Sequence, residues 1–323
     1  MGIIRTPPGC FYTILFPGSL EMHPPMLRPR ERSGPRRRWG QNFLVNTGAA
    51  AGIVAAFRPE PEDRVLEVGP GRGALTRLLL GRVGRLTAIE IDPDLVAALQ
   101  EQLAPMAPSG ELRIVLGNIL RLDLGDLLAG LGASSRRPAR VIANLPYNIA
   151  TAVILRFLLE DMKVSDLLVM VQREVAERIL ARPGRRSYGG LSVLCQTYSR
   201  IEPIKRLRPG SFRPRPKVES EVIHLTLRDP GGLASRDRQA LSGLLLAAFR
   251  HRRKTLVNNL SRLPRVRGAP GETLGAAGAT DLILRAGIDP SCRAETVPVE
   301  GYLRLLEEWR DTPGPNTPSC GEI

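Results

Sequence analysis

A regular alternation of short β-branched runs with longer helical segments constrains the fold of this chain most strongly. The expected strands are 64–68, 86–91, 113–116, 140–143, 167–171 and 222–227. Helical patterns such as 95–103 and 152–159 lie between them. This alternation is typical of a mostly parallel sheet with helices on both faces. We therefore expect an α/β domain built on a mostly parallel sheet.

The sequence changes character after residue 228. The segment RDPGGLASRD at 228–237 has the composition of a linker. Beyond it, two segments carry apolar residues at the spacing of one helical face: Leu241, Leu244, Leu245 and Ala248, then Val299, Tyr302, Leu303 and Leu306. We expect 36–228 to form the α/β domain and 233–309 a small all-helical domain. Composition predicts disordered segments at 1–35 and 311–323.

The formal charge is +14, from 46 basic and 32 acidic residues, which favours a polyanionic partner. No apolar run reaches the ~18–20 residues needed to cross a membrane, and the N-terminal CFYTILFPG is too short and broken for a convincing signal peptide. The cysteines lack CxxC spacing, so we expect neither a zinc site nor disulfides, and a cytoplasmic location. They are Cys10, Cys195, Cys292 and Cys320.

The stretch VLEVGPGRGALTRLLL, which begins at Val65, places glycines between a strand and a helix. Glycines there allow a sharp turn and a close approach of ligand to backbone. Glu90 ends the next strand and could accept hydrogen bonds from a ribose, and Asn118 follows the third strand. A dinucleotide and S-adenosylmethionine both fit this pattern. The early third glycine and the preceding Glu67 favour the cationic S-adenosylmethionine.

The fourth strand ends in Asn144-Leu145-Pro146-Tyr147, which suits the capture of an adenine amine. The side-chain oxygen of Asn144 and the carbonyl of Leu145 can accept from the two amine hydrogens. Pro146 fixes the backbone, and Tyr147 can stack on the base. No strong general base is required, because alignment does much of the work in attack on a sulfonium.

These residues belong to a longer series of motifs. The chain resembles the ribosomal RNA adenine dimethyltransferases, in particular their small-subunit branch, over about residues 36–308. The matching motifs are GQNFLVN, EVGPGRG, IEID, GNIL, NLPYNI, MVQREVAERI, YGGLSVLCQ, SFRPRPKVESEVI, HRRKTLVNNL and AGIDPSCRAETV. The resemblance implies a class I methyltransferase domain with a small helical domain. It also implies S-adenosylmethionine-dependent dimethylation of N6 in two adjacent adenosines of a small-subunit rRNA hairpin.

The resemblance also assigns roles to single residues. It implies a cofactor site made of Asn42, Leu44, Gly69, Gly71, Glu90, Asn118 and Asn144. It implies a target-base site made of Asn144, Leu145, Pro146, Tyr147 and Phe212, with the two aromatic rings stacking on the base. One departure is Asn118, where the family usually has Asp, so a weaker, uncharged acceptor faces the adenine of the cofactor.

Two basic clusters are candidates for contacts with RNA phosphates, although a solvated charged surface is the usual alternative. They contain Lys205, Arg206, Arg213, Arg215 and Lys217, then Arg252, Arg253 and Lys254. The partner expected from the resemblance is small-subunit rRNA or an immature 30S particle, bound by a monomer. The histidines form no cluster, no metal site is expected, and His224 is interpreted as structural.

Three alternatives remain at this point. The large-subunit adenine methyltransferases that confer macrolide resistance share the chemistry but act on another RNA. A non-catalytic RNA-binding or ribosome-assembly factor could use the same fold, although Glu90, Asn144 and Tyr147 argue for activity. An NAD-linked oxidoreductase is disfavoured by the glycine spacing and the arginine-rich charge.

Overall fold

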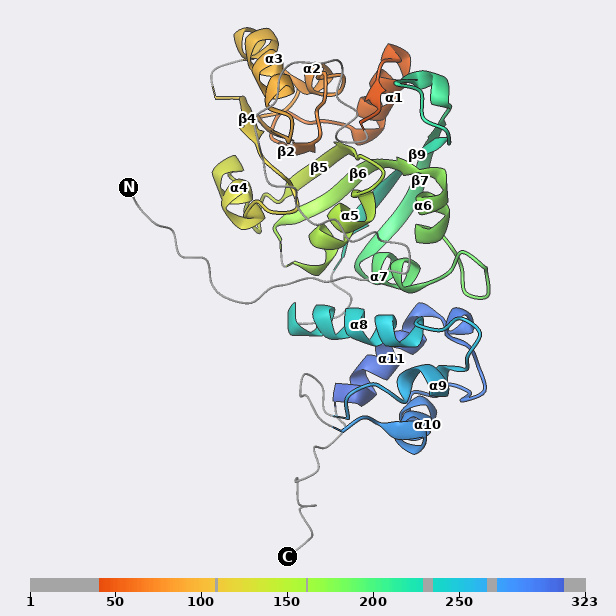
Figure 1. Ribbon diagram of the computed structural model, residues 1–323. Coiled ribbons are helices and arrows are strands. Elements are labelled where there is room, and N and C mark those ends of the chain that lie inside the picture. Colours follow the sequence, from red (N-terminus) through yellow and green to blue (C-terminus); the bar gives the residue numbers. More distant parts are fainter. Residues whose placement is uncertain (1–40, 108–109, 161, 229–234, 266–271, 311–323) are drawn as a thin grey trace, which may run out of the picture. The chain divides into compact units, whose positions relative to one another are not determined.

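The computed structural model describes residues 41–107, 110–160, 162–228, 235–265 and 272–310 (Figure 1). The segments predicted to be disordered, 1–35 and 311–323, lie outside these ranges, as does most of the predicted linker. The described chain begins with the short strand β1 and continues into an α/β region, which is followed by helices α8 to α11.

A seven-stranded sheet forms the centre of the α/β region as far as the described residues show, in the order β4-β3-β2-β5-β6-β9-β7. Strands β4 to β6 of this order run parallel, and β9 and β7 are antiparallel to their neighbours. The strands are β2 (Arg64–Val68), β3 (Arg85–Glu90), β4 (Leu112–Leu116), β5 (Ala139–Asn144), β6 (Val164–Gln172), β7 (Ser199–Leu207) and β9 (Ser220–Leu227). The predicted mostly parallel sheet is confirmed, whereas β7 was not predicted.

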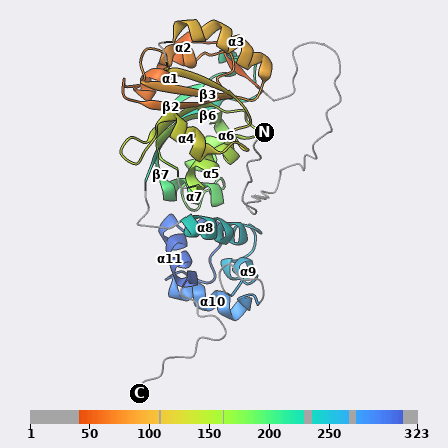
Figure 2. The same ribbon diagram turned by 90° about the vertical axis from the view of Figure 1, so that its left-hand side faces the viewer.

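Helices cover both faces of the sheet (Figures 1 and 2). One side carries α1 (Thr47–Phe57), α2 (Thr76–Leu79) and α3 (Pro93–Leu103), and the other carries α4 (Leu124–Leu131), α5 (Ala150–Leu159) and α7 (Gly190–Tyr198). Helix α6 (Arg173–Ile179) contacts β6 and β9. Because both faces are covered, the central strands are buried almost throughout, which explains their continuous apolar runs.

Two short strands link the beginning of the described chain to its middle. Strand β1 (Phe43–Leu44) pairs antiparallel with β8 (Phe212–Arg213), so Leu44 lies opposite Phe212. Both residues pack in the hydrophobic core beneath α1, together with Ile53 and Phe57 of that helix. Among the described residues, short 3₁₀ turns lie at Ala104–Met106, Pro209–Ser211 and Ala294–Thr296.

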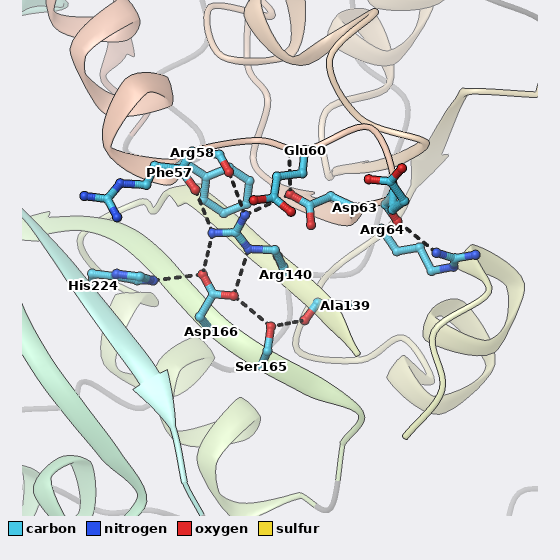
Figure 3. Close-up of polar contacts among 11 residues, drawn as sticks. Phe57, Arg58, Glu60, Asp63, Arg64, Ala139, Arg140, Ser165, Asp166 and His224 are labelled. Atoms are coloured by element: carbon cyan, nitrogen blue, oxygen red, sulfur yellow. Dashed lines mark hydrogen bonds and ion pairs between the residues drawn. The ribbon is translucent and has the colours of Figure 1, made fainter. Parts of the chain in front are cut away.

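A polar network at the amino ends of β5 and β6 fastens α1 to the sheet (Figure 3). The guanidinium of Arg140 donates to Asp166, to Asp63 and to the carbonyl of Phe57, at 2.6–3.1 Å. His224 lies 2.8 Å from the same Asp166 carboxylate. Burial alone would raise the pKa of Asp166, but hydrogen bonds from His224 and Arg140 hold this pKa at about 2. The network lies away from the carboxyl ends of the strands, so its arrangement is structural.

The C-terminal helices are α8 (Ser235–Ala248), α9 (Leu256–Leu260), α10 (Gly275–Arg285) and α11 (Val299–Arg310). The predicted apolar face of α8 is buried, and on α11 Tyr302 and Leu306 are buried whereas Leu303 is partly exposed. Helix α8 contacts α5 and α7, so the helical region packs directly on the α/β region. Among the residues that the structure describes, every helix is too short or too polar to span a bilayer.

Candidate active site

A hollow of about 860 Å³, part of it open to solvent, lies at the carboxyl ends of β2, β3, β4 and β5. Strand order reverses between β2 and β5, because the chain builds β3 and β4 on one side of β2 and β5 on the other. Ligands of open α/β sheets bind at such a reversal. The hollow therefore lies where the fold itself favours a binding site.

The glycine loop after β2 forms the floor of this hollow. Gly69 and Gly71 have φ angles of 69° and 58°, which side chains other than glycine rarely adopt. A Cβ atom on Gly71 would stand 3.0 Å from the ring of Phe43, and one on Gly69 would stand 3.4 Å from the carbonyl oxygen of Asn144. The loop thus needs glycine for its conformation and for its close contact with the opposite wall.

The carboxylate of Glu90 lies at the centre of the hollow and is held by backbone groups. Its oxygens accept from the N–H groups of Gly71, Ile91 and Asp92 at 2.8–3.1 Å, and Gln41 donates to it at 3.4 Å. Burial raises the pKa of Glu90, and these backbone bonds partly oppose the rise. This fixed carboxylate can present acceptor lone pairs to the hydroxyls of a sugar.

Asn118 lines the hollow just beyond β4, but its side chain also shapes its own turn. The Oδ1 atom accepts from the backbone N–H of Leu120 at 2.9 Å, a side-chain turn typical of Asn and Asp. The functional and the turn interpretations of Asn118 therefore apply together. The amide oxygen already accepts one hydrogen bond from the protein and keeps a second lone pair, and Asn118 lines the hollow.

Asn144, the last residue of β5, forms the wall opposite the glycine loop. Its Nδ2 atom donates to the carbonyl of Asn42 at 3.2 Å, which leaves the Oδ1 atom as an acceptor for a ligand. Leu145, Pro146 and Tyr147 continue the same wall. The two segments that the sequence assigned to the cofactor and to the target base thus meet at one side chain.

A hydrogen bond at the hydroxyl group holds the side chain of Tyr147 in place. Its hydroxyl lies 2.8 Å from the hydroxyl of Ser220, the first residue of β9, and burial raises the pKa of Tyr147. One edge of the ring is therefore fixed while the ring borders the hollow. This geometry presents an aromatic face at a constant place.

Phe212 does not lie where the sequence analysis expected it. We predicted a base-stacking ring outside the core, but its side chain is 1% exposed and packs with Leu44, Met170 and Val222. It does not line the hollow. The expected location outside the core was wrong, because Arg213, Pro214 and Arg215 are exposed whereas strand β8 turns the ring of Phe212 inward. The stacking role of Phe212 stays a prediction.

Several residues of the site were not predicted. Gln41 supports Glu90, the guanidinium of Arg72 lies 4.9 Å from the centre of the Phe43 ring, and Ser220 anchors Tyr147. Gln41 and Phe43 stand beside predicted residues in the GQNFLVN motif, which was the available signal. Ser220 carried none, because its contact depends on how β9 pairs with β6.

The predicted RNA-contacting residues are all exposed. Arg213 ends β8, and Arg215 and Lys217 lie on the segment that leads from β8 to Ser220 at the start of β9. Two of these residues form ion pairs: Arg252 pairs with Glu295 at 2.8 Å and donates to the carbonyl of Arg186, and Arg206 pairs with Glu221 at 3.7 Å. The described ranges hold no group of three or more His, Cys, Asp or Glu side chains placed to bind a metal ion.

Known proteins resemble this chain over most of its length. The ribosomal RNA adenine dimethylase family matches residues 33–309. The ribosomal RNA small subunit methyltransferase A of Syntrophotalea carbinolica is 42% identical over 273 residues, which cover 84% of this chain and 96% of that protein. The protein of the same name from Chromobacterium violaceum is 38% identical over 278 residues, covering 86% and 96%.

Solved structures support the fold. A dimethyladenosine transferase from Plasmodium falciparum superposes with a TM-score of 0.70 at 22% identity, covering 84% of this chain and 98% of that one. The 23S rRNA methyltransferase ErmE superposes with a TM-score of 0.58 at 24% identity, covering 83% and 99%. Together with the sequence matches, they confirm the resemblance and the Rossmann-like methyltransferase fold. The chain belongs to the ribosomal RNA adenine dimethylase family.

Proposed function

We propose that this protein dimethylates N6 of two adjacent adenosines in a hairpin near the 3′ end of small-subunit (16S) rRNA. The observation that carries the proposal is the meeting of Asn144 and Tyr147 with the glycine loop and Glu90 in one hollow. The names and the coverage of the curated relatives favour the small subunit over the large one.

The methyl donor of this family is S-adenosylmethionine, which supplies an electrophilic methyl group on a sulfonium. The residues around the hollow fit this molecule. Glu90 offers fixed acceptors for a ribose, and the glycine loop leaves space that a side chain would fill. The Oε2 atom of Glu67 is buried without a hydrogen-bond partner among the described residues, as a site for a cation requires. Asn118 would lie at the adenine end, and Asn42 and Leu44 at the methionine end.

The chain activates the target amine by holding it. The Oδ1 atom of Asn144 and the carbonyl of Leu145 would accept from the two amine hydrogens and aim the nitrogen lone pair at the methyl group. The bond from Asn144 to the Asn42 carbonyl keeps the amide in this orientation. Pro146 limits the backbone at this point. The proton released after attack passes to water, so no buried base is needed.

A base within an RNA helix must leave the stack before its N6 atom can be reached, which costs a few kcal/mol. Stacking on one aromatic ring returns about 1–3 kcal/mol. Tyr147 is placed to provide it, and its bond to Ser220 holds the ring still before the base arrives. Because Phe212 is buried, one ring rather than two would offset the extrusion.

The exposed basic residues would hold the RNA backbone. Arg213, Arg215 and Lys217 lie on β8 or just after it, and β8 pairs with the strand β1 that lines the hollow. Arg253 and Lys254 lie between α8 and α9 of the helical region. Each neutralised phosphate should contribute about 0.7–0.9 to the slope of log K against log salt. Replacing Arg215 and Lys217 with Ala should lower this slope by about 1.4–1.8. Replacing the exposed pair Arg136 and Arg137, which precedes β5, should leave the slope unchanged.

The decisive experiment combines labelled S-adenosylmethionine with small-subunit particles that lack the modification, and then maps the labelled bases. We expect label on N6 of the two adjacent adenosines. Asn144→Ala should abolish transfer and leave RNA binding nearly intact, whereas Asn148→Ala, an exposed asparagine of the same turn, should remain active. Normal turnover in Asn144→Ala would refute the role of Asn144.

Other outcomes would identify other functions. Tight binding to small-subunit particles without transfer would indicate a non-catalytic assembly factor. Label on large-subunit rRNA would indicate the other branch of the chemistry. We further propose that the protein acts in the cytoplasm as a monomer on immature 30S particles, which sedimentation of the protein with assembly intermediates would test.

A further inference from the structure

Glu67 is a buried carboxyl group that suits a cationic cofactor but takes no part in positioning the target amine. It is the fourth residue of β2, between β3 and β5, and its side chain is 1% exposed. It nevertheless borders the hollow, and its Oε2 atom has no hydrogen-bond partner among the described residues. Buried polar atoms almost always have partners in folded proteins. An orphaned oxygen at the edge of a ligand site therefore points to a partner that arrives with the ligand.

The neighbouring Glu90 borders the same hollow, but its carboxylate accepts several hydrogen bonds. Glu90 is bonded by three backbone N–H groups and by Gln41. Hydrogen bonds from Thr76 act on the Glu67 carboxyl group, but its Oε2 atom has no partner among the described residues. Burial raises the pKa of Glu67 to about 7, Thr76 partly opposes the rise, and the charge of Glu90 adds to it. The other ionisable groups that border the hollow are Arg72 and Tyr147.

We propose that the protonation state of Glu67 responds to the charge of the bound cofactor. Glu67 is a carboxylate when S-adenosylmethionine is bound and a neutral carboxylic acid when the demethylated product is bound. This proposal rests on the cofactor stated above and goes beyond the transfer reaction to how donor and product are distinguished. The two ligands share the adenosine and the amino-acid portion and differ in one positive charge on sulfur. A nearby positive charge favours the ionised form of a carboxyl group, and its loss favours the protonated form.

Binding of the cationic cofactor is coupled to loss of a proton from Glu67, so the direction of its pH dependence can be predicted. With a pKa near 7, Glu67 is about nine-tenths protonated at pH 6 and about one-tenth protonated at pH 8. Binding of the cation should therefore release up to about 0.9 proton at pH 6 and only about 0.1 at pH 8. Donor affinity should fall by up to about tenfold per pH unit below 7, whereas product affinity should change little. Once the methyl group has left, Glu67 regains a proton from solvent and the product is held less tightly than the donor was.

Isothermal titration calorimetry on the full chain tests this linkage. Titrations with S-adenosylmethionine and with S-adenosylhomocysteine at pH 6, 7 and 8, in buffers of different ionisation enthalpy, count the protons released. We expect release with the donor that rises as pH falls, and little release with the product. Glu67→Gln, which imitates the neutral acid, should abolish the release and make the ratio of the two affinities independent of pH.

A matched control is Glu111→Gln, because Glu111 is also buried but accepts from Gly81 away from the hollow. It should keep the wild-type proton release. Equal release with donor and product, or unchanged release in Glu67→Gln, would overturn the proposal. The wild-type comparison needs no variant, so it decides the matter even if Glu67→Gln misfolds. Absence of binding by either ligand would overturn the cofactor assignment as well, whereas donor binding without proton release would overturn this proposal alone.

Discussion

The buried position of Phe212 yields a prediction that separates a packing role from base stacking. Phe212→Ala removes most of a ring that is 1% exposed, and such truncations cost about 3–5 kcal/mol. For a region of this size each kcal/mol lowers Tm by about 2–4 °C, so Tm should fall by about 6–20 °C. Phe212→Leu keeps most of the apolar volume and should cost less than about 1.5 kcal/mol.

Phe212→Ala should also affect cofactor binding, because Phe212 lies opposite Leu44 in the β1–β8 pair. Phe212→Ala should weaken cofactor binding by loosening the strand that follows Gln41 and Asn42. Phe212→Leu should retain both cofactor binding and methyl transfer. Phe157→Leu is the matched control, since Phe157 is equally buried on α5 and does not line the hollow.

Thermal unfolding, calorimetry with the cofactor, and transfer rate per folded molecule measure the three quantities. Base stacking contributes about 1–3 kcal/mol, which corresponds to roughly 5–150-fold in rate or affinity. If Phe212→Leu remained as stable as Phe157→Leu but methylated RNA more than about tenfold more slowly, the ring would contact the base. The interpretation of Phe212 as a packing residue alone would then be refuted.

Three further predictions follow from the geometry. Asn118→Asp should tighten cofactor binding by up to roughly tenfold, because a charged acceptor forms hydrogen bonds about twice as strong; calorimetry that shows unchanged or weaker binding would contradict this. Ser220→Ala and Tyr147→Phe should each slow transfer a few-fold through loss of about 0.5–1.5 kcal/mol with little change in Tm, and the double variant should be no slower than either; additive losses would exclude the shared bond. The pKa of Asp166 is lowered to about 2, below its unfolded value of about 3.9, so its stabilisation is complete above about pH 5 and is lost as pH falls toward 2. Asp166→Asn should therefore lower the free energy of unfolding by on the order of 2 kcal/mol at pH 7 and flatten its acid dependence; equal acid profiles in denaturant titrations would refute the assignment.

The sequence predicted the fold and the strand-end residues well because both depend on local pattern. Gly69, Glu90 and Asn144 follow continuous apolar runs, and in a parallel sheet such positions meet at one edge. Strand β7 was not predicted because its residues are mostly exposed, four of the nine are charged and one is a proline, as is usual for an edge strand. No local pattern distinguishes it from a loop.

The sequence also did not predict side-chain contacts between segments that are distant in the chain. Ser220 meets Tyr147 only because β9 runs antiparallel to β6. Phe212 is buried only because β8 pairs with β1. Both facts depend on long-range pairing, which composition and spacing do not encode.

The pairing of β1 with β8 also bears on how the site is assembled. Gln41 and Asn42 directly precede β1, and the strand that holds β1 in place lies at Phe212–Arg213, after most of the sheet has passed in the sequence. The chain is synthesised from its amino end, so Gln41 and Asn42 cannot be held in place until the later strand β8 has been made. Closing so long a loop is slow relative to local contacts. A growing chain therefore gains a complete cofactor pocket only after nearly the whole α/β region is available. A fragment that ended before β8 would have the glycine loop and Asn144, but its Gln41–Leu44 segment would lack the strand that holds it in place.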